Sequence, residues 1–115
     1  MRESTFWLDE AVHVREFLRT YGKVCPVFRS SDLGRVAAIL RKLELFICPD
    51  GGMMHLAAAL QVPTLTLFFG TNPEVWHPPV ASSYYVQAPD NNPRALDPET
   101  VAQKAVNILN LTVKT

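Results

Sequence analysis

The residues best suited to chemistry form one short segment in the middle of the chain, Asp50-Gly51-Gly52-Met53-Met54-His55. An apolar run that predicts a buried strand precedes it, and a run that predicts a helix follows it. Two consecutive glycines carry no side chain, so a ligand can approach their backbone closely. The unpaired amides of the first helical turn, together with the helix dipole, favour an anion at that point. The segment therefore predicts a turn that binds phosphate or diphosphate without a lysine.

Two side chains of this segment suggest further ligand contacts. His55 falls in or near the first helical turn, where its imidazole could donate a hydrogen bond to a phosphate oxygen. The Asp50 carboxylate would repel phosphate, so we expect its partner to be a sugar hydroxyl, a ribose hydroxyl or a backbone amide of the turn. The alternative remains open that this is an ordinary turn, because Asp-Gly-Gly is common in turns and a lone helical histidine is usually not a ligand.

A second polar loop, Gly70-Thr71-Asn72-Pro73, follows the next apolar run along the chain. In open parallel sheets, ligands bind outside the carboxyl ends of the strands. We therefore expect Thr71 and Asn72 to reach the same ligand as the glycine turn, and the two loops to form a crevice. Trp76, further along, has two interpretations: a stacking wall for a base or sugar, or packing on its own domain, which is the commoner case.

Helical and strand-like segments alternate along the chain. Helices are expected over 5–21, over 33–42 with Ser30 or Ser31 as cap, over 53–60, and from Pro98 onward with Asp97 as cap. The apolar face of the last helix is expected to comprise Val101, Ala105 and Leu109, joined by Ala102 and Val106. Strands are expected over 23–28, 44–48, 64–69 and 84–87, and a long loop over 70–83. The strands are apolar throughout, which predicts an α/β fold with a Rossmann-like, partly parallel sheet of about four strands flanked by helices.

Composition excludes several classes of partner. The chain has 115 residues, enough for one domain, and its 11 basic residues balance its 11 acidic ones. This neutral balance gives no reason to expect a nucleic acid. The apolar runs are too short for a membrane span, no signal peptide is expected, and Cys25 and Cys48 are interpreted as buried thiols of a cytoplasmic protein. The spacing of Asp50, His55 and His77 matches no metal site.

The motif extends over a longer stretch, between residues 30 and 80. It comprises Asp50 to Leu60, Pro63, Leu67-Phe68, Thr71-Asn72-Pro73, Trp76 and Pro78. This stretch resembles the signature of the ADP-heptose:lipopolysaccharide heptosyltransferase family. The resemblance implies a GT-B architecture of two Rossmann-like domains, of which residues 1–115 would be a truncated C-terminal, donor-binding half. It also implies heptose transfer from ADP-heptose to a lipopolysaccharide core acceptor, with no tightly bound metal and no cofactor.

The resemblance also assigns residues. Asp50, Gly52 and His55 match the family's donor-binding loop, and Thr71 matches its second loop. The expected substrate-binding set is thus Asp50, Gly51, Gly52, Met53, Met54, His55, Thr71 and Asn72. The family usually carries its catalytic base on the N-terminal, acceptor-binding domain. No general base is therefore expected in this chain, and its catalytic residues stay unassigned.

Departures from the family pattern leave other interpretations open. Gly51 stands where serine is usual, Met53 where proline is usual, Phe69-Gly70 where Gly-Pro is usual, and Asn72 where aspartate is usual. The alternatives are a non-catalytic nucleotide-binding or interaction module, and another GT-B enzyme such as a sugar-nucleotide epimerase. Two strands of the family's sheet are not found, so the strands over 23–28 and 44–48 would have exposed edges. This predicts a rearranged small sheet or self-association.

Overall fold

The computed structural model describes residue 28 and residues 30–113. The elements in chain order are α2 (Leu33–Leu40), β1 (Phe46–Pro49), α3 (Gly52–Ala59), β2 (Thr64–Phe68), α4 (Pro73–Trp76), β3 (Ser83–Gln87), the 3-10 turns η1 (Pro89–Asn91) and η2 (Pro93–Ala95), and α5 (Pro98–Val113). The chain divides into two compact units, Met1–Val36 and Ala37–Thr115, and the sheet belongs to the second. The helix predicted over 5–21, the thiol of Cys25 and nearly all of the strand predicted over 23–28 lie outside the described residues.

The three described strands form one parallel sheet in the order β1-β2-β3. The α/β class and the parallel sheet predicted from the apolar strands are thereby confirmed, as a partial Rossmann-like arrangement. The central strand β2 is the most deeply buried, with Leu65 and Phe68 both fully covered. Its two threonines suit a strand because they are β-branched. Thr64, which is buried, satisfies its hydroxyl by donating to the Val62 carbonyl oxygen at 2.8 Å.

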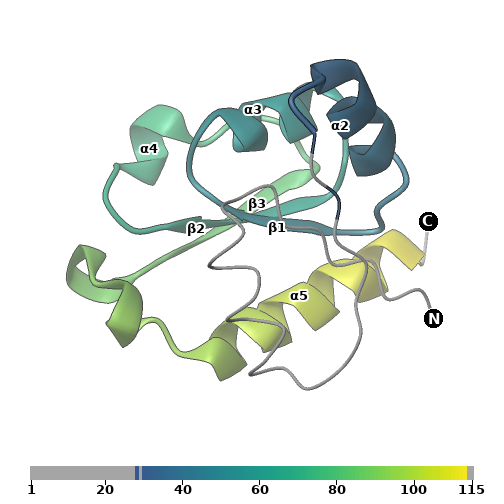
Figure 1. Cartoon of the computed structure of the whole chain (residues 1–115). Helices are drawn as coiled ribbons and strands as arrows, with labels where there is room; N and C mark the ends of the chain where they lie inside the picture. Colours follow the sequence, from purple (N-terminus) through teal and green to yellow (C-terminus); the bar gives the residue numbers. More distant parts are fainter. Residues whose placement is uncertain (1–27, 29, 114–115) are drawn as a thin grey trace. The chain divides into compact units, whose positions relative to one another are not determined.

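Helices α3 and α5 lie on opposite faces of this sheet (Figure 1). Side chains alternate between the faces along each strand, so Cys48 and Phe68 share one face. Met54 of α3 joins them in a buried apolar cluster, against which Phe46 packs. This cluster anchors α3, and with it the preceding glycine turn, to the carboxyl ends of β1 and β2.

The last helix begins where the sequence predicts but buries a partly different face. Asp97 caps it, because the Glu99 amide donates to Asp97 Oδ1 at 3.1 Å. Ile108, which the predicted face omits, is only 1% exposed, whereas Val106 is 49% exposed. The three main residues of the predicted face are confirmed as half-buried, namely Val101, Ala105 and Leu109, whereas Ala102 is exposed like Val106. Ile108 lies within this stripe at helical spacing from Val101 and Ala105, whereas Ala102 and Val106 lie outside it.

Two local predictions are wrong. Asp32, not Ser30 or Ser31, caps α2, since its Oδ1 accepts from the Gly34 amide at 2.9 Å and Ser30 Oγ accepts from the Asp32 amide at 3.0 Å. The loop predicted over 70–83 contains the single helical turn α4. Asn72 starts that turn by accepting the Glu74 amide at 3.0 Å, directly before a proline whose φ suits a helix start.

The outer edge of β1 carries few free donors. The Phe46 amide donates to the Pro63 carbonyl at 2.8 Å and the Asp50 amide to the Leu67 carbonyl at 3.3 Å, so these even-numbered residues face β2. Ile47 and Pro49 therefore turn their backbone nitrogens outward, and Pro49 has no N–H to offer there. Within the described part of the chain β2 is the one strand that pairs with β1. Any further pairing along this edge would meet an interrupted row of donors.

Candidate functional site

The two polar loops predicted from the sequence leave the same edge of the sheet. β1 ends at Pro49 and β2 at Phe68, and the register pairs Pro49 with Leu67. At this edge the Thr71 hydroxyl donates to Asp50 Oδ2 at 2.5 Å. A direct bond therefore joins two side chains that are 21 positions apart in the sequence. Sequence reasoning placed both residues near one ligand but did not predict that they contact each other.

The glycine turn presents bare backbone. Gly51 has φ 153° and ψ −165°, a conformation that only glycine adopts without strain. A Cβ placed on Gly51, Gly52 or Gly70 would meet no atom within 4 Å, so the space beside all three is open. Side chains of the described residues therefore leave the turn accessible, as a close approach by a ligand requires.

The amino end of α3 keeps its first amides available. Its cap residue is Gly51, and no described side chain accepts a hydrogen bond from this helix end. The Met54 amide is used, since it donates to the Gly51 carbonyl at 3.2 Å. The amides of Gly52 and Met53, in the first turn, have no intrahelical acceptor. An anion at this end would receive these donors and the favourable end of the helix dipole.

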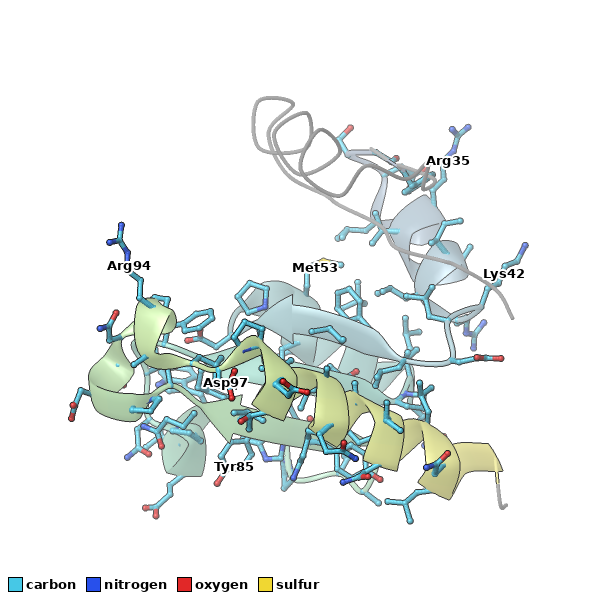
Figure 2. All side chains as sticks on the ribbon, turned by 90° about the horizontal axis from the view of Figure 1, so that it is seen from below. Arg35, Lys42, Met53, Tyr85, Arg94 and Asp97 are labelled. Atoms are coloured by element: carbon cyan, nitrogen blue, oxygen red, sulfur yellow. The ribbon has the colours of Figure 1, made fainter. Side chains whose placement is uncertain are left out.

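The other predicted site residues differ in what they expose. His55 is exposed, whereas Met54 is 1% exposed and lies in the core, so its side chain points away from any ligand. Met53 is half-buried, and Figure 2 shows its side chain projecting outward from the ribbon. Asn72 uses its side-chain oxygen to cap α4, which leaves its NH2 group as a donor.

The thiol beneath the site is a neutral core group. Cys48 is buried and unpaired by any disulfide, as expected from the sequence. Burial raises its pKa to about 11, the negative charge of Asp50 adds to this, and a hydrogen bond with Thr66 opposes it. The thiolate is the nucleophilic form of cysteine, so this residue is unsuited to attack a substrate near neutral pH.

The rings at the end of α4 and just after it differ in burial, since His77 is packed and Trp76 is exposed. The His77 ring lies 4.7 Å from the ring centre of Tyr85 and 6.4 Å from that of Phe68, and its Nε2 is 3.1 Å from Ser83 Oγ. Burial lowers the pKa of His77, against an opposing backbone hydrogen bond at Ser83. Trp76 is 54% exposed, so packing on its own domain, the commoner interpretation, covers less than half of it.

The described residues contain no group of three or more histidine, cysteine, aspartate or glutamate side chains placed to hold a metal ion. Among the same residues, no helix is both long enough and apolar enough to cross a membrane. The polar groups that remain available at the sheet edge are the first backbone amides of α3, the imidazole of His55, the NH2 group of Asn72 and the carboxylate of Asp50.

A parallel sheet with helices on both faces, and a glycine turn and a polar loop at the carboxyl ends of adjacent strands, define a partial Rossmann-like α/β domain. The family model described as glycosyltransferase family 9 (heptosyltransferase) matches residues 9–105. The chain belongs to this family, which confirms the resemblance seen in its motif and makes glycosyl transfer its class of activity. Neither a curated protein nor a solved structure matches the chain.

Proposed function

We propose that residues 1–115 form a single donor-binding domain that holds a nucleotide sugar for a GT-B glycosyltransferase. In this proposal the donor is ADP-heptose, the acceptor is a lipopolysaccharide core, and an N-terminal domain completes the enzyme. The observation that supports it most is the uncapped, side-chain-free start of α3 next to the Asp50 carboxylate. We propose the cytoplasm as its location, where a free thiol such as Cys48 stays reduced.

The groups at the sheet edge favour a ligand with two kinds of polar atom. The amides of Gly52 and Met53 only donate, so they suit the oxygens of a diphosphate. An ionised carboxylate only accepts, so Asp50 suits a hydroxyl of the ligand and repels its phosphates. Inorganic diphosphate would supply acceptor oxygens for the amides but no hydroxyl for Asp50, and a free sugar would supply the hydroxyl but no diphosphate. A nucleoside diphosphate sugar satisfies both.

Two side chains supplement this binding. His55, exposed in the first part of α3, would donate a ring N–H to a phosphate oxygen. The NH2 group of Asn72 would donate from the second loop. The chain contributes binding and orientation of the donor. The proposal assigns the general base to the completing domain, and therefore no catalytic residue to this chain.

Calorimetric titration with ADP, UDP and ADP-heptose tests the proposal. We expect ADP-heptose to bind selectively, and His55→Ala to weaken it about ten-fold or more, since a charge-assisted hydrogen bond contributes about 1.5–3 kcal/mol. Lys104→Ala, which removes a basic side chain from an exposed position on α5, is the matched control and should leave binding unchanged. Absence of any nucleotide binding would favour a non-catalytic interaction module. A preference for UDP would favour another GT-B enzyme, such as an epimerase.

Self-association along the β1 edge stays a prediction. The outward-facing row at this edge is interrupted by Pro49, so pairing with a second copy would form few backbone hydrogen bonds. Static light scattering over a range of concentrations tests it directly. A stable, well-folded monomer at all concentrations would contradict self-association.

A further inference from the structure

We infer that Thr71 is a positioning residue that orients the Asp50 carboxylate toward a hydroxyl of the ligand, and that it does not bind phosphate itself. This inference rests on the proposed donor site. It changes the role that the family motif suggests for Thr71, from a direct ligand contact to a support for Asp50 of the first loop.

The single proton of the Thr71 hydroxyl limits what this side chain can bind. A threonine hydroxyl has one proton to donate, and in the structure it goes to Asp50 Oδ2. Phosphate oxygens of an ionised diphosphate accept hydrogen bonds and cannot donate to threonine. Thr71 can therefore serve a phosphate oxygen only by giving up Asp50. The uncapped amides at the start of α3 would serve that purpose at no such cost.

Hydrogen bonds hold Asp50 and the loop of Thr71 in place on either side of the contact. The Asp50 backbone is fixed to β2, because its amide donates to the Leu67 carbonyl at 3.3 Å. The loop that carries Thr71 is fixed on its far side, because the Asn72 side chain caps α4. The remaining freedom is rotation of the Asp50 side chain. The bond from Thr71 restricts that rotation and leaves Oδ1 as the oxygen without a partner among the described residues.

The fixed orientation of the Asp50 carboxylate affects which ligands the site selects. A carboxylate held in one orientation accepts a ligand hydroxyl without first losing side-chain freedom, and such preorganisation strengthens binding. Loss of the Thr71 hydroxyl should weaken only the part of the binding that depends on a ligand hydroxyl. Phosphate binding at the start of α3 should continue. The hydroxyl belongs either to the transferred sugar or to the ribose, and the two ligands used below distinguish these sources.

The experiment titrates ADP and ADP-heptose into the full chain carrying Thr71→Val, Thr71→Ser, Asp50→Asn or the double substitution Thr71→Val with Asp50→Asn. We expect Thr71→Val to weaken ADP-heptose binding about five- to ten-fold, the loss of one hydrogen bond, and Thr71→Ser to restore it. The double variant should bind no more weakly than Asp50→Asn alone, because the two residues act as one unit. Weakening confined to ADP-heptose assigns the hydroxyl to the sugar, and equal weakening of both ligands assigns it to the ribose.

Thr100→Val is the matched control, because Thr100 donates to Asp97 Oδ2 in another exposed threonine–aspartate pair, on α5. It should bind both ligands as the wild type does. Unchanged binding by Thr71→Val, failure of Thr71→Ser to restore it, or additive losses in the double variant would each overturn the positioning role while leaving the donor site intact. If the wild-type chain binds neither ligand, the proposed function fails, and the positioning role fails with it.

Discussion

Cys48 on β1 and Thr66 on β2 face each other across the parallel strand pair, with Sγ 3.8 Å from Oγ1. Both side chains are buried, 5% and 0% exposed respectively. A buried hydroxyl requires a partner, and the sulfur offers one without introducing a charge. The core beneath the proposed donor site thus contains two polar atoms, Cys48 Sγ and Thr66 Oγ1, and carries no charge. It remains uncharged as long as the thiol keeps its proton.

The first prediction concerns stability in alkaline solution. Because burial raises the pKa of Cys48 to about 11 from 9.0, the native chain holds a proton between these pH values that the unfolded chain releases. The free energy of unfolding should thus fall by roughly 2–3 kcal/mol as pH rises through this window. Urea unfolding at pH 8 and pH 11 measures the loss. Cys25→Ser should serve as the background, so that one thiol remains.

Lysine and tyrosine side chains also titrate at high pH, so the comparison needs a variant without the thiol. Cys48→Ala in the same background lowers stability at every pH by leaving a cavity. It also removes the part of the fall in unfolding free energy between pH 8 and pH 11 that the Cys48 thiol causes. An equal loss between pH 8 and pH 11 in both proteins would show that Cys48 does not contribute to it.

The second prediction concerns the glycine turn. Gly51→Ala should destabilise the chain by about 1–3 kcal/mol, because φ 153° is strained for any residue with a Cβ although space is free around it. Gly51→Ser, which introduces the residue usual in the family, should cost a similar amount. Gly52→Ala is the control. It has equally open space and no positive φ, so it should be neutral or stabilise the helix by up to about 1 kcal/mol. Equal urea midpoints for the two alanine variants would refute the strain at Gly51.

The third prediction concerns the packing of α5. Ile108→Ala should cost about 2–5 kcal/mol, because Ile108 is 1% exposed and its loss leaves a cavity. Val106→Ala, on the same helix, should change stability by less than about 0.5 kcal/mol, because Val106 is 49% exposed. Urea unfolding of both variants tests the orientation of the helix. The reverse order of effects would mean that α5 presents a different face to the sheet.

The fourth prediction concerns His77. Burial lowers the pKa of its imidazole below 6.5, so the unfolded chain binds this proton more readily than the native chain. This group's contribution to stability is therefore complete above pH 6.5 and is lost as pH falls toward the pKa of the folded state. An NMR titration of the His77 ring should give the lowered pKa directly.

A pair of adjacent tyrosines provides the control for this titration. Tyr85→Ala uncovers the imidazole that Tyr85 packs against, and the pKa of His77 should then rise toward its ordinary value. Tyr84→Ala alters the opposite face of β3 and should leave the pKa unchanged. A titration of His77 that does not respond to Tyr85→Ala would place the cause of the lowered pKa elsewhere.

Several features of the fold follow from neighbouring residues and were therefore open to prediction. The runs over 44–48 and 64–69 are apolar enough to predict buried parallel strands. Asp97 before Pro98 predicts a capped helix start, and Asp50-Gly51-Gly52 predicts a turn with bare backbone. In each case the determining interactions span only a few residues. The capping of α2 by Asp32 and the turn α4 were missed, because several nearby polar side chains compete for such positions and only the final geometry selects among them.

The amino-acid sequence by itself determined the family, the α/β class and the location of the candidate donor turn, because these depend on local pattern and motif. Tertiary structure alone decided that Thr71 donates to Asp50, that Ile108 rather than Val106 is buried, and that Gly51 adopts its positive φ. The physical reason is that these features depend on how strands β1 and β2 pair and on which side of α5 meets the sheet. Contacts between segments far apart in the chain set that geometry, and no local pattern encodes it.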